Sequence, residues 1–307
     1  MQAVNKKEFI LEEKAINYVD RRSGEICQES VFGNASLRFM YETLLGRTLW
    51  GVLFNSAHLS NLLGSYYDSP RSKKAVAKLA ATPGCNPQDA EFAVEEYPTF
   101  NAFFTRRLKK GARPCDADTG KISSPSDGRL FGYENLDGKS PVPVKGAQRT
   151  LEDLCCTELP FAKAAVAVIR LAPIDYHRFH FPCQCSQSAA PQVIRGRYHS
   201  VNPVALAKRP DVYVENTRQI TNLFSESCGN FFYIEVGAFG VGSIVQTSDT
   251  GEHAKDDEKG YFKFGGSTVI LIFDNSKIRW NADLLKNTSD GLETLIRQGE
   301  TIAEVLK

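Results

Sequence analysis

Two of the five histidines lie in one short segment, Asp175-Tyr-His-Arg-Phe-His-Phe-Pro182. Histidine is the side chain that exchanges protons most readily near neutral pH, so this pair indicates acid–base chemistry. In an extended segment the spacing of His177 and His180 would direct the rings to opposite faces, whereas in a turn both could face one pocket. Either histidine alone would more often be structural, but the two together are candidates for general acid–base catalysis.

Two cysteines follow the histidines, so that His177-x-x-His180-x-x-Cys183-x-Cys185 contains four side chains of the types that bind zinc. Zinc sites usually take ligand pairs from two separate elements, and here nine consecutive residues would have to surround one ion. We therefore expect no metal, and a zinc-dependent hydrolase remains a remote alternative.

A carboxylate that could assist a histidine occurs in Ser124-Pro-Ser-Asp127-Gly. An Asp-Gly pair after proline is most often a turn. The functional alternative is that Asp127 orients a histidine and stabilises its protonated form, as the carboxylate does in serine–histidine–aspartate triads.

A serine that could act as a nucleophile occurs in Gly265-Gly-Ser-Thr268, directly before an apolar run. Glycine at position 266 leaves the preceding carbonyl unhindered, because glycine has no side chain. With a histidine base, Ser267 could therefore attack Gly266 and cleave the chain through an N→O acyl shift. The same glycines could instead form a phosphate-binding turn, although the lysine and spacing of a P-loop are absent.

The elements that must position these residues change along the chain. Apolar side chains recur at helical spacing from Leu37 onward, and we expect helices within residues 37–67, over 72–81 and over 87–96. Five basic side chains follow within residues 106–113. The apolar helical face packs either on its own domain or on a membrane surface.

After Pro114, short apolar runs alternate with Gly, Pro, Asp and Ser, a pattern that predicts strands joined by turns. The predicted strands cover residues 128–133, 164–171, 192–198, 231–236 and 242–247. The spacing does not alternate strands with helices, so we do not expect a doubly wound parallel sheet. The predicted fold class is α+β, with a helical N-terminal region (residues 1–112) followed by a β-rich catalytic core (residues 113–307).

Composition narrows the class of protein. The 37 Lys and Arg residues balance the 36 Asp and Glu residues, which argues against a nucleic-acid binder. No apolar run approaches the roughly 18 residues that a membrane-spanning helix requires. The first residues lack the apolar stretch of a secretory signal, so we expect a reducing, intracellular environment in which the eight cysteines stay unpaired.

Taken together, the three segments resemble the phosphatidylserine decarboxylase family, in particular its bacterial type. Tyr-His-Arg-Phe-His (176–180) is similar to the histidine motif of the family, Ser-Pro-Ser-Asp-Gly (124–128) to its aspartate motif, and Phe-Lys-Phe-Gly-Gly-Ser-Thr-Val (262–269) to its self-processing site. Supporting similarities occur at residues 100–106, 200–202 and 236–244. The resemblance covers nearly the whole chain.

The resemblance implies an enzyme that generates its own pyruvoyl group. Asp127 orients His180, and His180 deprotonates Ser267, which attacks Gly266. Elimination and hydrolysis then leave a β chain (1–266) and an α chain (267–307) that begins with the pyruvoyl group. This group forms a Schiff base with phosphatidylserine and accepts the electron pair left by CO₂. His177 protonates Cα or stabilises the departing carboxylate.

The family also implies a partner and a location. The substrate is phosphatidylserine in a bilayer and the product is phosphatidylethanolamine, so residues 37–67 and the basic run 106–113 become candidates for contact with the membrane surface. We expect a peripheral protein on the cytoplasmic face of the cell membrane, and the resemblance suggests a homodimer.

Two features depart from the family pattern, namely the segment at residues 247–259 and the pair Cys183 and Cys185. Two alternative functions stay open besides the zinc hydrolase. One is a pyruvoyl decarboxylase for a small soluble amino acid, and the other is a non-catalytic lipid-binding relative.

Overall fold

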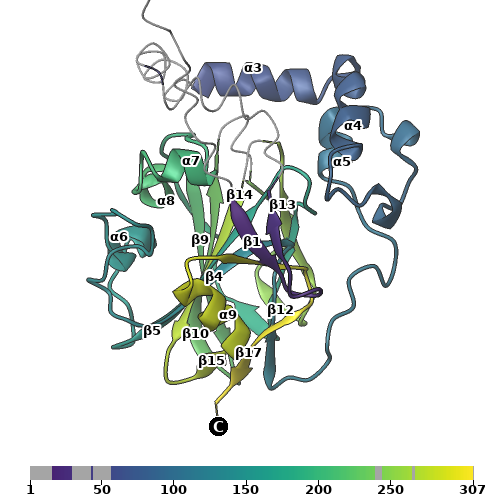
Figure 1. Cartoon of the computed structure of the whole chain (residues 1–307). Coiled ribbons are helices and arrows are strands. Elements are labelled where there is room, and N and C mark those ends of the chain that lie inside the picture. The colour runs from purple at the N-terminus through teal and green to yellow at the C-terminus, as the bar shows by residue number, and fades with distance from the viewer. Residues whose placement is uncertain (1–15, 30–42, 44–56, 239–243, 265–266, 307) are drawn as a thin grey trace, which may run out of the picture.

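The computed structural model describes residues 16–29, 43, 57–238, 244–264 and 267–306. Strands predominate in this part of the chain and short helices lie at its margins (Figure 1), which confirms the α+β class. The predicted helical, membrane-associating segment that starts at residue 37 lies outside the described residues as far as residue 56, apart from residue 43.

One large sheet forms the centre of the molecule. Its order is β12-β7-β9-β10-β14-β5-β4-β16-β1-β2, and β8 pairs with β9 beside this path. Among these pairs only β1 with β16 is parallel. The strands are β1 (Asn17–Asp20), β2 (Ile26–Gln28), β4 (Gly128–Leu136), β5 (Ala164–Leu171), β7 (Cys185–Gln187), β8 (Gln192–Ile194), β9 (Arg218–Ser225), β10 (Gly229–Gly237), β12 (Gly251–His253), β14 (Ser267–Asp274) and β16 (Glu293–Ile296).

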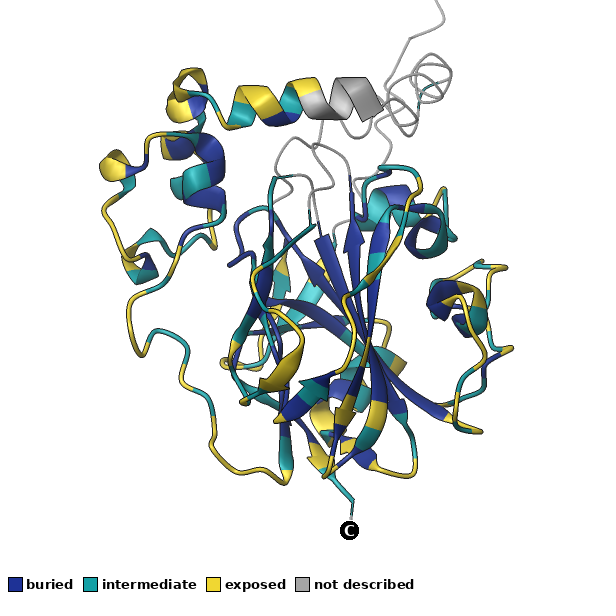
Figure 2. Cartoon of the chain, turned by 180° about the vertical axis from the view of Figure 1, so that it is seen from behind, coloured by how far each residue is buried: buried dark blue, intermediate teal, exposed yellow. Residues whose placement is uncertain are grey.

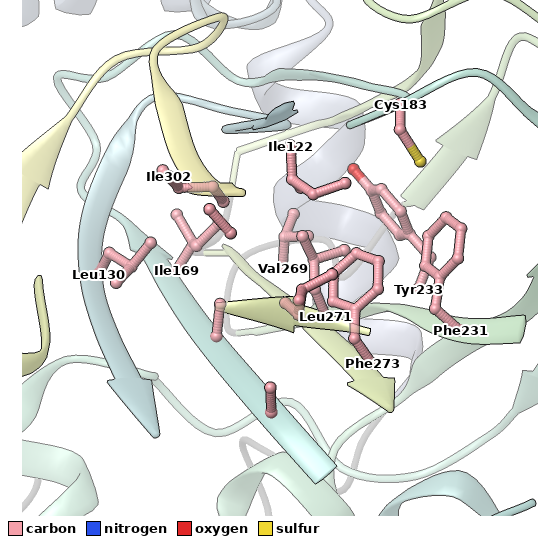
Figure 3. Packing of buried hydrophobic residues seen from close by; sticks show 14 of the residues in the cluster. Ile122, Leu130, Ile169, Cys183, Phe231, Tyr233, Val269, Leu271, Phe273 and Ile302 are labelled. Atoms are coloured by element: carbon pink, nitrogen blue, oxygen red, sulfur yellow. The ribbon is translucent and has the colours of Figure 1, made fainter. Parts of the chain in front are cut away.

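Two smaller sheets cover one face of the large sheet. They are β11-β13-β6, made of β11 (Ile244–Gln246), β13 (Glu258–Phe262) and β6 (Arg178–His180), and β15-β17-β3, made of β15 (Ile278–Trp280), β17 (Thr301–Val305) and β3 (Lys121–Ser123). Side chains from both small sheets join Val269, Leu271 and Phe273 of β14 in one buried core. Figure 3 shows part of this core, with Ile122 of β3 and Ile302 of β17 beside the β14 side chains. We call the side of the large sheet that bears this core the inner face.

Short helices cover the opposite face. Ile270 and Ile272 of β14 pack there against side chains of α6 (Leu151–Cys155) and α8 (Val212–Glu215). The strands β5, β10 and β14 are covered on both sides and are buried almost throughout (Figure 2). Their sequences are therefore largely apolar and do not alternate. Two further short helices of the β-rich part are α7 (Pro203–Leu206) and α9 (Ala282–Ser289).

A third packing unit joins the N-terminal helices to the sheet. It contains α4 (Lys73–Ala80) and α5 (Phe100–Phe104), whose apolar side chains pack against Ala172 and Ile174 just beyond β5. Thr99 begins α5 by accepting a hydrogen bond from the Ala102 N–H at 3.1 Å. The longer helix α3 (Ala57–Tyr67) precedes this unit and lies across the end of the molecule (Figure 1), followed by a 3₁₀ turn at Pro70–Ser72.

Most of the predicted elements are present, but two predictions fail. The helix predicted over 72–81 is α4, and each predicted strand overlaps an observed one. The helix predicted over 87–96 is wrong, because the segment forms two 3₁₀ turns, Pro87–Asp89 and Val94–Glu96, separated at Ala90 by a bridge to Leu108. The N-terminal region is also not wholly helical, since β1 and β2 extend the large sheet.

Within the described residues, no helix has the length and apolar character needed to cross a bilayer.

Candidate active site

Ser267 is the first residue of β14 and is fully buried. It lies opposite Gly237 of β10 and Leu171 of β5, at the end of the three central strands. Val269 and Leu271 belong to the inner core, so strand alternation places the Ser267 side chain on the inner face as well. Its hydroxyl has no hydrogen-bond partner among the described residues. Burying a hydroxyl without a hydrogen-bond partner costs free energy. Such unsatisfied groups are rare in folded proteins and indicate a functional role.

The segment before the predicted cleavage bond is anchored to the helical unit. Phe264 packs against Tyr67 of α3 at 4.6 Å and against Phe100 of α5 at 4.9 Å between ring centroids. Its N–H donates to Asn101 Oδ1 at 3.0 Å. Residues 265 and 266 lie outside the described part, so the structure describes Phe264 and Ser267 on either side of them.

His177 is buried at the turn between β5 and β6. Its Nδ1 lies 3.0 Å from the Asp175 carbonyl oxygen, which can only accept, so Nδ1 carries the proton and Nε2 is an acceptor. Nε2 has no partner among the described residues. The ring lies 3.7 Å from that of Phe104. Burial and the nearby Arg106 guanidinium lower the His177 pKa to about 3, so the imidazole is neutral at pH 7.

The turn that holds His177 depends on buried charges. Asp175 accepts hydrogen bonds from the Ala172 N–H at 2.6 Å and from the Arg129 guanidinium. Arg129 and Arg170 both pair with Glu29, at 3.5 and 2.5 Å, and Arg170 also binds Glu293. The segment after β2 is therefore bonded to the strands that carry the site.

His180 lies at the end of β6, over the inner face. Its Nδ1 donates to the Asp256 carbonyl oxygen at 2.8 Å, and its Nε2 lies 3.3 Å from the Tyr176 hydroxyl. Tyr233 of β10 donates to the His180 carbonyl oxygen at 3.3 Å, which places His180 over the strand that pairs with β14. As in His177, the carbonyl partner fixes the proton on Nδ1, so Nε2 is the acceptor that faces the Tyr176 hydroxyl.

Asp127 has different partners from those the resemblance implies. Arg113 donates to its two oxygens at 2.8 and 2.6 Å, and the Gln298 N–H donates to Oδ1 at 2.8 Å. No hydrogen bond among the described residues joins Asp127 to His180. A longer connection exists, because the Gln298 side chain donates to Asp256, whose carbonyl oxygen holds His180.

Sequence reasoning missed several of these supporting residues. In the sequence Arg113 is only one charge of the basic run 106–113, and neither Gln298 nor Asp256 belongs to a motif. A detectable signal did exist for Arg170 and Glu235, which are single charges inside otherwise apolar strands. Charged residues are almost never fully buried unless they are paired, and both are buried here.

The cysteines do not assemble with the histidines. Cys183 lies 4.0 Å from Cys228 between their sulfur atoms, and both belong to the inner core together with Cys185. Across the described ranges, no group of three or more His, Cys, Asp or Glu residues could hold a metal ion, and every cysteine described is a free thiol.

Comparisons with known proteins identify the family of this chain. Residues 100–304 match the family model described as phosphatidylserine decarboxylase. The phosphatidylserine decarboxylase proenzyme of Ruminiclostridium cellulolyticum is 37% identical over 297 residues, which cover 95% of this chain and 98% of the relative. That of Clostridium novyi is 38% identical over 285 residues, with 91% and 95% covered. The chain therefore belongs to the phosphatidylserine decarboxylase family.

Proposed function

We propose that this protein decarboxylates phosphatidylserine to phosphatidylethanolamine after cleaving itself between Gly266 and Ser267. The family membership supports the overall reaction. The observation that supports self-processing most directly is the buried hydroxyl of Ser267 at the start of β14, which has no hydrogen-bond partner in the part of the chain that the structure describes.

In the first reaction His180 is the base. Its Nε2 takes the Ser267 hydroxyl proton, and the oxygen attacks the Gly266 carbonyl carbon. The peptide C–N bond breaks as an ester forms, and the Ser267 nitrogen receives the proton. Loss of the Cα proton then expels the Gly266 carboxylate, and water replaces the nitrogen as ammonia. The products are a β chain (1–266) and an α chain (267–307) with a pyruvoyl group at its N-terminus.

The surroundings of Ser267 fit such a group. The residue lies at a strand end, buried from water, with a neutral histidine belonging to the turn just beyond the neighbouring strand. When present, the pyruvoyl group supplies an electron sink for the charge that CO₂ leaves behind. Exclusion of water favours this chemistry because charges interact more strongly in a site of low dielectric constant.

His177 acts in the second reaction. Its unprotonated Nε2 takes a proton from the substrate ammonium group, which must become neutral before it can react with a carbonyl. The same nitrogen returns the proton to Cα after CO₂ has left. The low pKa of His177 favours the second half of this transfer, since the imidazolium is a strong acid that readily gives up its proton to Cα.

The membrane contact involves α3. Leu62 and Tyr66 are exposed on this helix, and Tyr67 on the same helix packs against Phe264 near the cleavage site. An apolar face of this kind can rest in the headgroup region of a bilayer. We propose a peripheral protein on the cytoplasmic face, with a homodimer as its assembly.

Intact-protein mass spectrometry tests self-processing. The wild type should give two species that divide after Gly266, the smaller one being pyruvoyl-modified, whereas Ser267→Ala should stay intact. His180→Asn should also stay intact. His177→Asn should be cleaved yet fail to release CO₂ from phosphatidylserine. A wild type that remains a single 34.1 kDa species would contradict the proposal and favour the non-catalytic lipid-binding alternative.

A further inference from the structure

An open pocket of about 510 Å³ borders the catalytic histidines, and the function proposed above assigns it no role. Six of its lining residues matter here, namely Arg107, Lys109, Arg113, Tyr176, Glu258 and Gln298. The pocket is therefore lined by the loop after α5, by the histidine segment and by β13.

The pocket touches the site directly. Tyr176 contributes to its wall, binds His180 Nε2 at 3.3 Å and precedes His177 in the chain. Glu258 lies opposite His180 in the pairing of β13 with β6. A molecule in this pocket would thus contact Tyr176, whose hydroxyl lies next to His180 Nε2.

The pocket carries uncompensated positive charge. Glu258 is paired with Arg178 at 2.8 Å, and the charge of Arg113 is balanced by Asp127 at 2.6 Å. Arg107 and Lys109 are exposed, and among the described residues no carboxylate lies within 4.0 Å of either. Lys109 donates to the Gln88 carbonyl oxygen at 2.9 Å, which keeps its ammonium group at the wall.

We propose that this pocket binds the phosphodiester of the substrate headgroup, with Arg107 and Lys109 as its ligands. Arginine offers a planar pair of donors to phosphate oxygens and lysine offers a point charge. In phosphatidylserine only one oxygen and one methylene separate the phosphorus from the reacting Cα. A phosphate site must therefore adjoin the catalytic histidines, as this pocket does through Tyr176.

The inference rests on the proposed decarboxylation, and its test separates the two claims. Short-chain phosphatidylserine, dispersed as monomers below its critical micelle concentration, removes any contribution from a membrane surface. With this substrate, Arg107→Gln and Lys109→Gln should each raise KM about tenfold, the effect of losing one charge-assisted hydrogen bond. The kcat should stay within a factor of two, and self-cleavage should be complete.

Lys110→Gln is the matched control, because Lys110 is an exposed cation of the same run that does not line the pocket. It should keep the wild-type KM. Arg107→Lys and Lys109→Arg, which conserve charge, should recover most of the lost affinity and show that the fold is intact.

An unchanged KM for monomeric substrate in both neutral variants would overturn the inference. If binding to anionic vesicles fell at the same time, the two cations would serve attachment to the membrane and not the headgroup. A loss of kcat with KM unchanged would equally overturn it. Failure of the proposed function looks different, since the wild type itself would then release no CO₂.

Discussion

At the scale of single residues, the environment of His177 sets both its reactivity and a cost in stability. The ring is buried, donates through Nδ1 to a carbonyl oxygen and has no partner at Nε2 in the described part of the chain. The free Nε2 of this neutral imidazole can accept a proton only at a cost in free energy, because burial disfavours the charged ring.

This cost predicts a pH dependence of stability. The pKa of His177 is about 3 in the folded chain and about 6.5 when unfolded. Below pH 6.5 His177 binds a proton in the unfolded state but not in the folded state. The free energy of unfolding therefore falls as pH falls from 6.5 towards 3. Relative to pH 7.5, this contribution reaches about 2–3 kcal/mol at pH 4.5. Urea denaturation of His177→Asn, in an uncleaved Ser267→Ala background, should lack it.

His253→Asn provides the control, because His253 lies partly exposed at the surface. It should lose stability on acidification as much as its Ser267→Ala parent does. Equal losses in the His177 variant and the parent would show that burial of His177 is not what couples stability to pH.

Single residues also show how much of the site can be predicted from the sequence. His177, His180 and Ser267 were found because their residue types carry chemistry and because their segments resemble family motifs. Arg113 and Asp256 were missed, because a hydrogen bond to a distant carbonyl or carboxylate leaves no local pattern. Whether Asp127 acts on His180 directly stays a prediction.

At the scale of elements, β13 carries a lysine into the core. Lys259 Nζ lies 2.6 Å from Glu235 of β10 and 2.8 Å from Gln246 of β11, and both members of the ion pair are fully buried. Its ammonium group also lies 5.0 Å from the centre of the Tyr233 ring. Burial lowers the pKa of Lys259 and raises that of Glu235, against the attraction between the two charges. The pair joins the small sheet to the large one two residues away from the Gly237–Ser267 pair.

Buried ion pairs cost most when only one partner is removed. In the uncleaved Ser267→Ala background, Lys259→Met should lower the free energy of unfolding by about 3–5 kcal/mol, because Glu235 is left buried without its partner. The double variant Glu235→Leu/Lys259→Met should return close to the parent, since two apolar side chains of similar size replace the pair. Urea denaturation measures both effects. A double variant as unstable as the single one would contradict the idea that the unpaired carboxyl causes the loss of stability.

The elements differ in how well the sequence predicts them. β5 and β14 are long apolar runs, so burial on both faces fixes them without further information. Residues 87–96 have helical composition, but Pro87 and the bridge from Ala90 to Leu108 divide them into two turns. The three-residue strands β6 and β11 form because they pair with β13. The pairing of β6 with β13 joins distant parts of the chain, which a local sequence pattern does not show.

At the scale of the whole molecule, the site and the exposed face of α3 lie at the same end. Ser267 begins β14 at the end where Gly237 completes β10, and Phe264 joins this end to α3 through Tyr67. Lys263 also pairs with Asp68, just after α3, at 2.8 Å. Docking through α3 would therefore bring the cleaved junction towards the lipid headgroups.

This placement predicts which exposed apolar side chains contribute to membrane binding. Leu62 on α3 is 67% exposed, whereas Phe224 is 48% exposed near the opposite end of the large sheet, where β9 turns into β10. Burying one leucine contributes about 1.5–3 kcal/mol, so Leu62→Glu should weaken sedimentation with phosphatidylserine vesicles at least tenfold, and Phe224→Glu should not. Both variants should remain self-cleaved and active on monomeric short-chain substrate, since neither residue lies in the site. Equal losses of vesicle binding in the two variants would mean that no single end of the molecule faces the membrane, and the role of α3 would have to be given up.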